Sequence, residues 1–188
     1  MFCVLLIAYP SIARSEQEGR ILVQQHRLAC PHPMASTLAL RGAYHYKYMR
    51  VLSLFKAALY DQVENREKSI LDAVPKCLVL RYERNISASD FRDVTIKGVN
   101  ANLNGAQIAR IKPALDAYNK LYVDIHPGDS YALAYAPSTG VELFFNGTLL
   151  GHVNDESFIP ALFAIWLGPE KNMSNKLRDH LLGKGKRR

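Results

Sequence analysis

The residues that could bind a metal lie in one short segment near the start of the chain. His26, Cys30 and His32 are close together in the sequence, and imidazole and thiolate are the ligands that zinc prefers. Their spacing fits no common zinc pattern, and the sequence shows no second pair of ligands. We therefore expect no metal site, and nothing else in the sequence predicts a cofactor.

A second polar group, Asp124, His126 and Asp129, brings carboxylates and an imidazole close together in the sequence. The intervening Pro127-Gly128 makes this segment typical of a turn that leads into a strand. The chain contains no glycine-rich phosphate loop, HExxH motif or GxSxG motif. It also lacks the ribonucleoprotein, zinc-finger and helix-turn-helix signatures, so we expect no nucleic-acid partner.

The segment from residue 40 to residue 60 holds aromatic and cationic side chains that could contact a ligand. It is rich in aromatic and branched residues, as strands are, and it is long enough for two strands or one long bent strand. Tyr44, Tyr46 and Tyr48 alternate with other residues and therefore share one face of a strand. This face could line a cleft or belong to the core, and the sequence leaves both interpretations open.

The elements that would position such a site are clearest between residues 123 and 168. Alternating side chains predict strands at 131–135, 141–145 and 148–153, and Asn146-Gly147 is a strong hairpin signal because a type I′ turn needs positive φ at both central residues. The apolar period then changes to about 3.6, which predicts a helix with one apolar stripe formed by Phe158, Leu162, Ile165 and Trp166. That stripe must pack on one face of the sheet.

The remaining elements are predicted from the same periodicities and from cap residues. The expected strands are two short ones around Pro31-His32-Pro33, within residues 20–40, and one at 77–82. The expected helices are 69–74, 87–103, 106–118 and 177–182. In the helix at 87–103, Ser87 or Ser89 is the expected cap, and the expected inner stripe is Phe91, Val94 and Gly98 with Val99 or Ile96. This order predicts one α+β domain, an antiparallel sheet with helices on one face.

The two ends of the chain differ in composition from its middle. An apolar run from Phe2 to Ala13 is too short to span a bilayer and is followed by polar residues, which predicts a secretory signal peptide within residues 1–20. From residue 171 onward, seven basic residues and one acid carry +6 of the net charge of +7. We therefore expect a folded domain at 21–170, a solvated basic tail at 171–188, and an exported protein, periplasmic or otherwise. Contact between the tail and an anionic membrane is the alternative.

The chain has three cysteines, of which Cys3 lies in the predicted signal peptide. Cys30 and Cys77 are far apart in the sequence. They could form one disulfide or be two separate small buried residues, and the sequence does not distinguish the two cases.

Several motifs together resemble the bacterial chalcone isomerase-like proteins. They are Phe-Lys-Ala-Ala-Leu-Tyr at 55–60, Ser-Ala-Ser-Asp-Phe at 87–91, His-Pro-Gly-Asp at 126–129, Phe-Asn-Gly-Thr-Leu-Leu-Gly at 145–151 and Ile-Trp-Leu-Gly at 165–168. The resemblance covers most of residues 38–168. It implies an open-faced β-sandwich, in which a long antiparallel sheet carries a layer of helices on one face, with a ligand cleft between the layers.

The isomerases that this family resembles add a phenolate oxygen across an enone, which requires polar groups that stabilise the enolate oxygen. The resemblance places Phe55 where those enzymes have a strand threonine, Phe91 where they have a helix tyrosine, and Gly98 where they have an asparagine. None of these three side chains can donate a hydrogen bond. We therefore expect no chalcone isomerase activity.

The fatty-acid-binding relatives hold a carboxylate with an arginine and a tyrosine. The tyrosine position is again Phe55, and the cation corresponds to Lys47, which precedes Tyr48, or to Arg41. Lysine attracts a carboxylate as a point charge, without the bidentate fork of arginine. Either cation could instead be an ordinary strand residue that faces solvent.

The predicted function is therefore binding of a small amphipathic ligand, such as a fatty acid, without chemistry. The expected ligand-binding residues are Lys47, Arg41, Tyr48, Phe55, Phe91 and Gly98. The alternative is an isomerase, an intramolecular lyase, that acts on an unknown substrate with Lys47, Arg41 or Tyr82 in the cleft. A third interpretation is an envelope protein that interacts with a partner through its basic tail.

Overall fold

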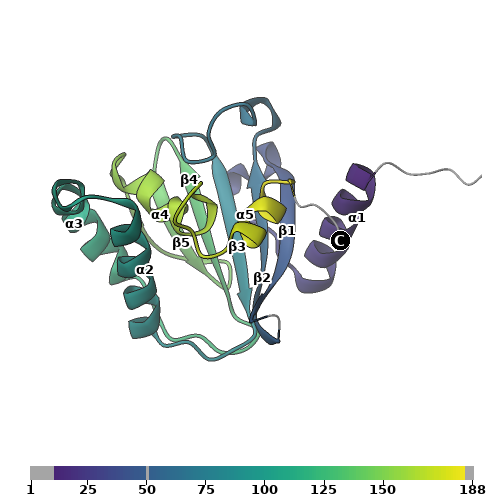
Figure 1. The fold of residues 1–188 in the computed structure, drawn as a ribbon, viewed down its shortest axis with the longest axis horizontal. Helices are drawn as coiled ribbons and strands as arrows, with labels where there is room; N and C mark the ends of the chain where they lie inside the picture. Colours follow the sequence, from purple (N-terminus) through teal and green to yellow (C-terminus); the bar gives the residue numbers. More distant parts are fainter. Residues whose placement is uncertain (1–10, 50, 185–188) are drawn as a thin grey trace, which may run out of the picture.

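Six strands form one antiparallel sheet, and each strand pairs with its neighbours in the sequence (Figure 1). The computed structural model describes residues 11–49 and 51–184 of the chain. The strands are β1 (Ala39–Tyr48), β2 (Leu52–Asp61), β3 (Lys76–Tyr82), β4 (Ser130–Ala136), β5 (Gly140–Phe145) and β6 (Thr148–Val153). The predicted meander is thus β4 to β6, and β3 joins it to the two strands formed by residues 40–60.

The Asn146-Gly147 hairpin is confirmed. The φ angles of Asn146 and Gly147 are 49° and 86°, so both central residues have the positive φ that a type I′ turn requires. This turn joins β5 to β6 and completes the meander at the edge of the sheet.

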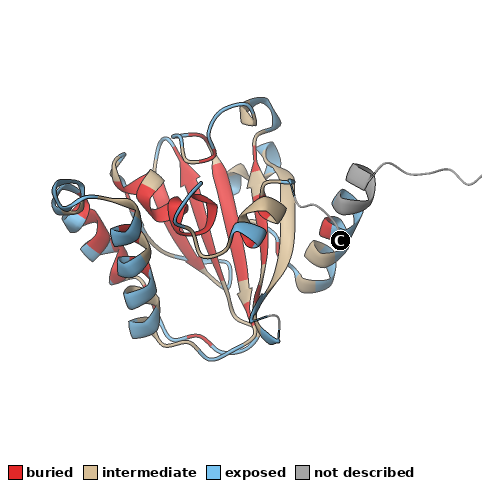
Figure 2. Ribbon diagram, viewed as in Figure 1, coloured by how far each residue is buried: buried red, intermediate tan, exposed pale blue. Residues whose placement is uncertain are grey.

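A layer of helices covers one face of the sheet, as the resemblance implied (Figure 1). Its members are α2 (Ala88–Asn102), α3 (Gly105–Asn119), α4 (Phe158–Leu167) and α5 (Asn175–Leu181). The strands β3 and β4 and the helix α4 are almost entirely buried, whereas α2 exposes its outer side (Figure 2). The α+β fold with an open sheet and a helical layer is therefore confirmed.

Capping boxes begin α2 and α3. The Ser87 side chain accepts a hydrogen bond from the Asp90 amide, and the Asp90 carboxylate accepts one from the Ser87 amide. Asn104 and Gln107 form the same reciprocal pair at the start of α3. Each box satisfies two amide groups that a helix start leaves without partners. The helix α3 continues through Pro113.

The inner side of α2 differs from the predicted stripe. Val94 and Ile96 are exposed, while Thr95 and Val99 are buried. Thr95 can face inward because its hydroxyl pairs with the hydroxyl of Tyr122. Thr95 thus takes the buried position that the apolar pattern alone predicts for its neighbours Val94 and Ile96, because its hydroxyl has a buried hydrogen-bond partner.

Residues 11–38 contain two helices where the sequence predicted, in part, two short strands. They are α1 (Ser11–His26) and a short 3₁₀ helix, η1 (Pro33–Thr37). Arg27, with a φ of 50°, follows the end of α1, and the His32 side chain accepts a hydrogen bond from Met34 at the start of η1. The prediction of strands around Pro31-His32-Pro33 is wrong because proline in the first turn and a capping side chain favour a helical turn here.

α1 and η1 belong to the face of the sheet opposite the helical layer. Residues that alternate along β2 and β3 enter two separate cores: Ala57 and Leu78 pack with the helical layer, whereas Ala58 and Val79 pack with the segment that contains α1. The second core is completed by Leu28, Cys77, Ala132, Ala134 and Phe144. The prediction that all helices share one face thus holds for α2 to α5 and not for α1.

A disulfide between Cys30 and Cys77 attaches this N-terminal segment to β3. The two cysteines are 47 residues apart in the sequence, which is why the sequence did not show whether they pair. The cross-link fixes the chain between α1 and η1 onto the second core.

Helices occupy parts of both predicted terminal segments. α1 crosses residue 20, so residues 11–20 belong to a helix that contacts β1; residues 1–10 lie outside the described residues. Leu177 and Leu181 of α5 are fully buried, and a Cβ atom on Gly42 of β1 would collide with the carbonyl oxygen of His180. Residues 171–184 therefore belong to the domain and do not form a solvated tail.

Residues 69–74 form turns and no helix, because the segment is short and ends at Pro75; the short 3₁₀ helix η2 (Val63–Asn65) precedes them. Among the described residues, no helix combines the length and the apolar character needed to cross a membrane.

Candidate functional site

The space between the sheet and the helices α2 and α3 is filled by aromatic rings, and we call it the aromatic gap. Phe91 of α2 lies with its ring centroid 5.2 Å from that of Tyr82, 5.3 Å from Tyr122 and 5.1 Å from Tyr131. The Phe55 ring of β2 lies 5.7 Å from Tyr82. Centroid distances of this size are those of favourable ring pairs, so the gap is a packed aromatic core.

Two predicted site residues, Phe55 and Phe91, lie at this gap, and a third, Gly98, lies at the contact between α2 and α4. Phe55 and Phe91 contact the same ring, that of Tyr82, from the sheet and from α2. Gly98 faces α4, where a Cβ atom would lie 2.7 Å from Cγ1 of Ile165. The position that carries asparagine in the isomerases is therefore occupied here by the side chain of Ile165, and it does not open onto a cleft.

Two tyrosine hydroxyls of the aromatic gap, those of Tyr131 and Tyr122, are used by the protein itself. Tyr131 donates to the Val123 carbonyl at 2.8 Å and accepts from the Val123 amide at 2.9 Å. Tyr122 and Thr95 share a hydrogen bond of 2.9 Å. The Tyr118 hydroxyl is buried and has no hydrogen bond of regular geometry to a described residue.

Burial raises the pKa of these phenols. It raises that of Tyr131 to about 12, and it holds those of Tyr82, Tyr118 and Tyr122 well above the ordinary value. A buried phenol in an apolar site stays neutral because its charged form loses hydration. The phenols of the gap, including that of Tyr82, are therefore neutral at neutral pH. None of them is an ionised tyrosine that could act as a base.

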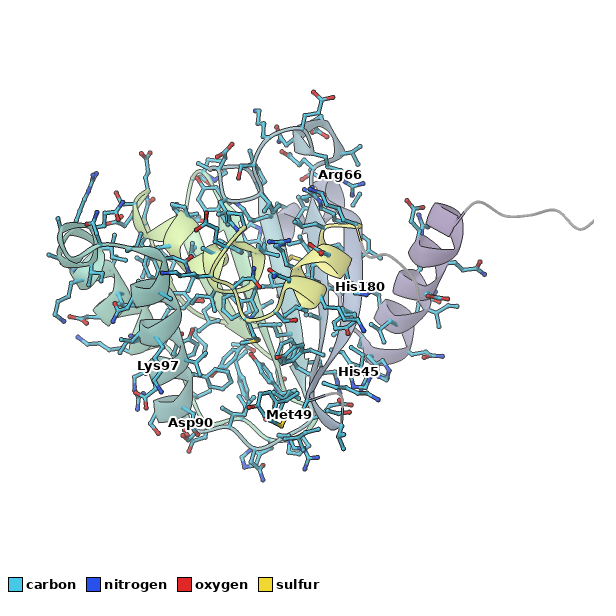
Figure 3. The ribbon with its side chains drawn as sticks, viewed as in Figure 1. His45, Met49, Arg66, Asp90, Lys97 and His180 are labelled. Atoms are coloured by element: carbon cyan, nitrogen blue, oxygen red, sulfur yellow. A yellow bond between two sulfur atoms is a disulfide. The ribbon has the colours of Figure 1, made fainter. Side chains whose placement is uncertain are left out.

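The predicted cations do not come together with this gap. The Arg41 Nη1 atom lies 2.6 Å from the Asp61 carboxylate, which also accepts from Arg66 Nε at 2.9 Å. Arg41 lies near the start of β1 and the exposed Lys47–Tyr48 pair lies at its end. Figure 3 shows Arg66 and Met49, which neighbour these two groups, at opposite ends of the sheet. Arg41 is thus neutralised by a structural ion pair, and Lys47 and Tyr48 face solvent.

Lys76 is a buried titratable group that the sequence did not single out. Its Nζ atom donates to the Asp72 carbonyl at 2.6 Å and lies about 5 Å from the ring centroids of Tyr135 and Phe163. Burial lowers the pKa of Lys76 to about 8. The side chain is completely enclosed, so a substrate has no access to this amine and its role is structural.

A second cluster of titratable groups lies toward the α1 face. Glu83 accepts hydrogen bonds from Lys56 and, at 2.7 Å, from His45. Although burial opposes it, these hydrogen bonds lower the pKa of Glu83. A carboxylate that is ionised and already occupied by two donors is more typical of a surface ion cluster than of a general base. No group of His, Cys, Asp or Glu among residues 11–49 and 51–184 has the arrangement of a metal site.

An open groove lies among α2, α3, α4 and the loop before β3, and we call it the α2–α3–α4 groove. Its volume is about 500 Å³, and its apolar lining comprises Leu71, Leu103, Ile111, Pro160, Ala161, Ala164 and Pro169. The polar lining comprises Asn102, Gln107, Arg110, Ser157 and Glu170. No signal in the sequence identified it, because its residues come from five separate segments.

Arg110 is the distinctive polar group of this groove. It lies on the exposed side of α3, and no described acid forms an ion pair with it. Asn102, by contrast, is fully engaged as a donor to the carbonyls of Gly98 and Lys171. The groove therefore combines an apolar floor with one cation that can take an anionic ligand group.

The comparisons with known proteins assign the chain to a family. The model of the chalcone isomerase-like family matches residues 30–183. The chain therefore belongs to the chalcone isomerase-like family.

A solved structure that resembles this fold is the crystal structure of a fatty-acid binding protein from Arabidopsis thaliana. It has a TM-score of 0.59 at 10% sequence identity and covers 78% of this chain and 87% of the plant chain. At this identity the likeness concerns the fold alone. No curated protein sequence matches the chain significantly.

Proposed function

We propose that this protein binds a small amphipathic carboxylate, with a fatty acid as the best candidate, and performs no reaction on it. The observation that carries the proposal is the α2–α3–α4 groove, with its apolar floor and with Arg110, which forms no ion pair with a described acid. Small-molecule pockets typically have about 300–1,000 Å³ and a mostly apolar lining with a few polar groups. The ligand named for the Arabidopsis neighbour is of the same chemical class.

The lining of the groove defines how such a ligand would lie. The carboxylate would accept hydrogen bonds from the Arg110 guanidinium, which presents a planar fork that matches two carboxylate oxygens. The acyl chain would cover Leu103, Ile111 and Ala164. Glu170 lines the same groove and would repel a second negative charge, so the expected ligand is a monocarboxylate.

The absence of a reaction follows from the aromatic gap. Phe55 and Phe91 have no donors, Ile165 occupies the space beside Gly98, and the Tyr131 hydroxyl is bonded to the backbone. An oxyanion donor that is missing typically costs about 3 kcal/mol of transition-state stabilisation. We expect a chalcone to cyclise at the background rate in the presence of the purified protein. Cyclisation that disappears in Tyr82→Phe would instead establish the alternative isomerase.

The binding proposal is tested by the ligand content and by one matched pair of variants. Lipids extracted from the purified protein and analysed by mass spectrometry should contain fatty acids. In a titration with a fluorescent fatty acid, Arg110→Glu should weaken binding by roughly 10- to 100-fold, the value of a hydrogen-bonded ion pair.

The control is Lys112→Glu, which makes the same charge change two residues along α3. Lys112 is exposed and pairs with Asp116 at 2.6 Å, and it does not line the groove. Equal affinity of the wild type and Arg110→Glu, or equal loss in both variants, would contradict the proposal.

Export remains our proposal for the location of the protein. It is supported by the apolar run from Phe2 to Ala13 and by the Cys30–Cys77 disulfide, since disulfides persist in oxidising compartments. The expected cleavage after Ala13 would remove only the first three residues of α1. Intact mass of the secreted protein should show a mature chain that begins near Arg14 and has no free thiol; a full-length intracellular chain would contradict it.

A further inference from the structure

The turn between β1 and β2 presents a group of large apolar side chains to solvent, and we call it the β1–β2 tip. Tyr48 is 51% exposed, Met49 78% and Val51 85%, and Leu52 is also exposed. Figure 3 shows Met49 at the end of the sheet opposite Arg66. Single exposed apolar residues are common on proteins, but four of them at one turn are a patch that calls for a partner.

The conformation of this turn is costly for the residues it contains. The Val51 amide donates to the Tyr48 carbonyl at 3.1 Å and closes the turn, and Met49 has a φ of 48°. A hairpin turn with positive φ favours glycine, asparagine or aspartate, as at Asn146-Gly147 in the same sheet. Stability alone would therefore select asparagine and not methionine at residue 49.

The surroundings of the tip are cationic. Lys47 and Arg84 are exposed, and Arg84 Nε donates to the Ser53 carbonyl at 3.3 Å beside the tip. Neither cation has an acidic partner among the described residues, and Glu83, which precedes Arg84, is already held by Lys56 and His45. The exposed Lys47 and Arg84 therefore attract a negatively charged surface to this end of the sheet.

The size of the patch indicates which surface it fits. A stable protein interface buries about 1,200 Å² or more in total, which four side chains on one turn do not supply. A bilayer needs no matching shape: a few apolar side chains enter the headgroup region while basic residues contact anionic lipids.

We propose that the β1–β2 tip is a membrane-contact site that inserts Met49 and Val51 into the surface of a bilayer containing anionic lipids. Lys47 and Arg84 contact the lipid phosphates. This contact requires no ligand in the α2–α3–α4 groove, so its failure and the failure of the binding proposal are distinguishable. It differs from the membrane contact that the sequence assigned to the C-terminal basic residues.

The test is flotation of the full chain with vesicles of phosphatidylcholine, with and without phosphatidylglycerol. The wild type should bind the anionic vesicles and not the neutral ones. Met49→Asn with Val51→Thr should raise the lipid concentration for half-maximal binding at least about tenfold. Both changes suit the turn, because asparagine tolerates positive φ and threonine keeps the branched Cβ, so the variant should fold as the wild type does.

Two further variants separate the apolar and the electrostatic contributions. Leu149→Thr removes an exposed apolar side chain on β6, away from the tip, and should bind as the wild type does. Lys47→Gln should weaken binding roughly fivefold at low salt, and less at high salt. In Val51→Trp, brominated lipids should quench the added fluorescence, since Trp166, the natural tryptophan, is buried.

Three results would overturn the proposal. The first is a wild type that binds neither kind of vesicle. The second is undiminished binding of the Met49→Asn, Val51→Thr variant, which would assign the contact to another surface, such as the C-terminal basic residues. The third is a concentration-dependent dimer, seen by light scattering and abolished in that variant, which would show that the tip contacts a second copy of this chain.

Discussion

The two faces of the sheet are held in different ways. The face under α2 to α5 is covered by large side chains, including Tyr118, Tyr131, Phe158 and Phe163, which form one continuous core. The face under α1 has a smaller core, and its covering segment is attached by the Cys30–Cys77 disulfide.

Hydrogen bonds complete the attachment on the α1 face. Tyr60 donates to the Leu28 carbonyl at 2.7 Å, and His32 Nε2 lies 2.7 Å from the Glu142 carboxylate. The comparison teaches that the helical layer is stabilised mainly by burial of apolar area, whereas the N-terminal segment depends on a few specific bonds. Breaking those bonds should therefore affect the second face selectively.

Removal of the disulfide should have the largest effect. Cys30→Ala with Cys77→Ala should lower the free energy of unfolding by about 2–5 kcal/mol, because the cross-link restricts the unfolded chain. Denaturant unfolding measures this, and hydrogen exchange should show faster opening of residues 16–38 than of α4. A reductant should destabilise the wild type and leave the double variant unchanged. Equal unfolding midpoints of the two proteins would contradict the proposed difference between the faces.

Lys76→Met tests how much the burial of the Lys76 charge, on the face covered by α2 to α5, lowers the free energy of unfolding. Its pKa is lowered from 10.5 to about 8, so above about pH 8 the unfolded chain binds more protons than the folded one, and stability rises with pH. From about pH 7.5 to about pH 9.5 the wild type should gain about 2 kcal/mol relative to Lys76→Met. Parallel pH profiles of the two proteins, measured by denaturant unfolding, would show that Lys76 is not desolvated.

Gly98→Ala tests how closely α2 and α4 pack. The added Cβ would lie 2.7 Å from Ile165 Cγ1, and overpacking of about 1–3 kcal/mol outweighs the helix propensity gain of about 1 kcal/mol. We expect a net loss of about 1 kcal/mol in thermal or denaturant unfolding. In an Ile165→Ala background the same change should stabilise the protein. Stabilisation in both backgrounds would mean that the two helices are not in contact at Gly98.

Tyr60→Phe should have an effect no larger than that of Gly98→Ala, a loss of about 1 kcal/mol in the free energy of unfolding. The variant removes the donor to the Leu28 carbonyl and leaves that buried carbonyl without this partner. The change should also speed hydrogen exchange in residues 16–38, as disulfide removal does. Faster exchange in α2 or α3 instead would show that the Tyr60 hydrogen bond does not act mainly on the face covered by α1.

Local signals predicted the meander and the helical layer. The Asn146-Gly147 turn needs only its own two residues, and the α2 cap needs only Ser87 and Asp90. These elements were correct because the physics that forms them acts within a few residues. The α2 stripe was partly wrong, because burial of Thr95 depends on the Tyr122 hydroxyl, which the chain brings close only after folding.

The second face and the groove were not predictable from local signals. α1 begins within the apolar run that is typical of a signal peptide. The sequence therefore predicts a leader over the first part of this helix and a strand over the rest. The Cys30–Cys77 pairing joins distant segments. The resemblance makes Arg41 a candidate ligand-binding cation, and no local pattern indicates its ion pair with Asp61, which is 20 residues away. The α2–α3–α4 groove combines five segments, none of which has a motif of its own.

The most direct test of the central claim is the position of a bound fatty acid, measured by chemical-shift changes in labelled protein. If the ligand occupies the α2–α3–α4 groove, the amides of Leu103, Arg110 and Ala164 should shift with a common saturation curve, and in Arg110→Glu the shifts of Leu103 and Ala164 should need a roughly 10- to 100-fold higher ligand concentration. Shifts confined to Phe55, Phe91 and Tyr131 would place the ligand in the aromatic gap, and the absence of any saturable shift would show that the protein does not bind this class of ligand.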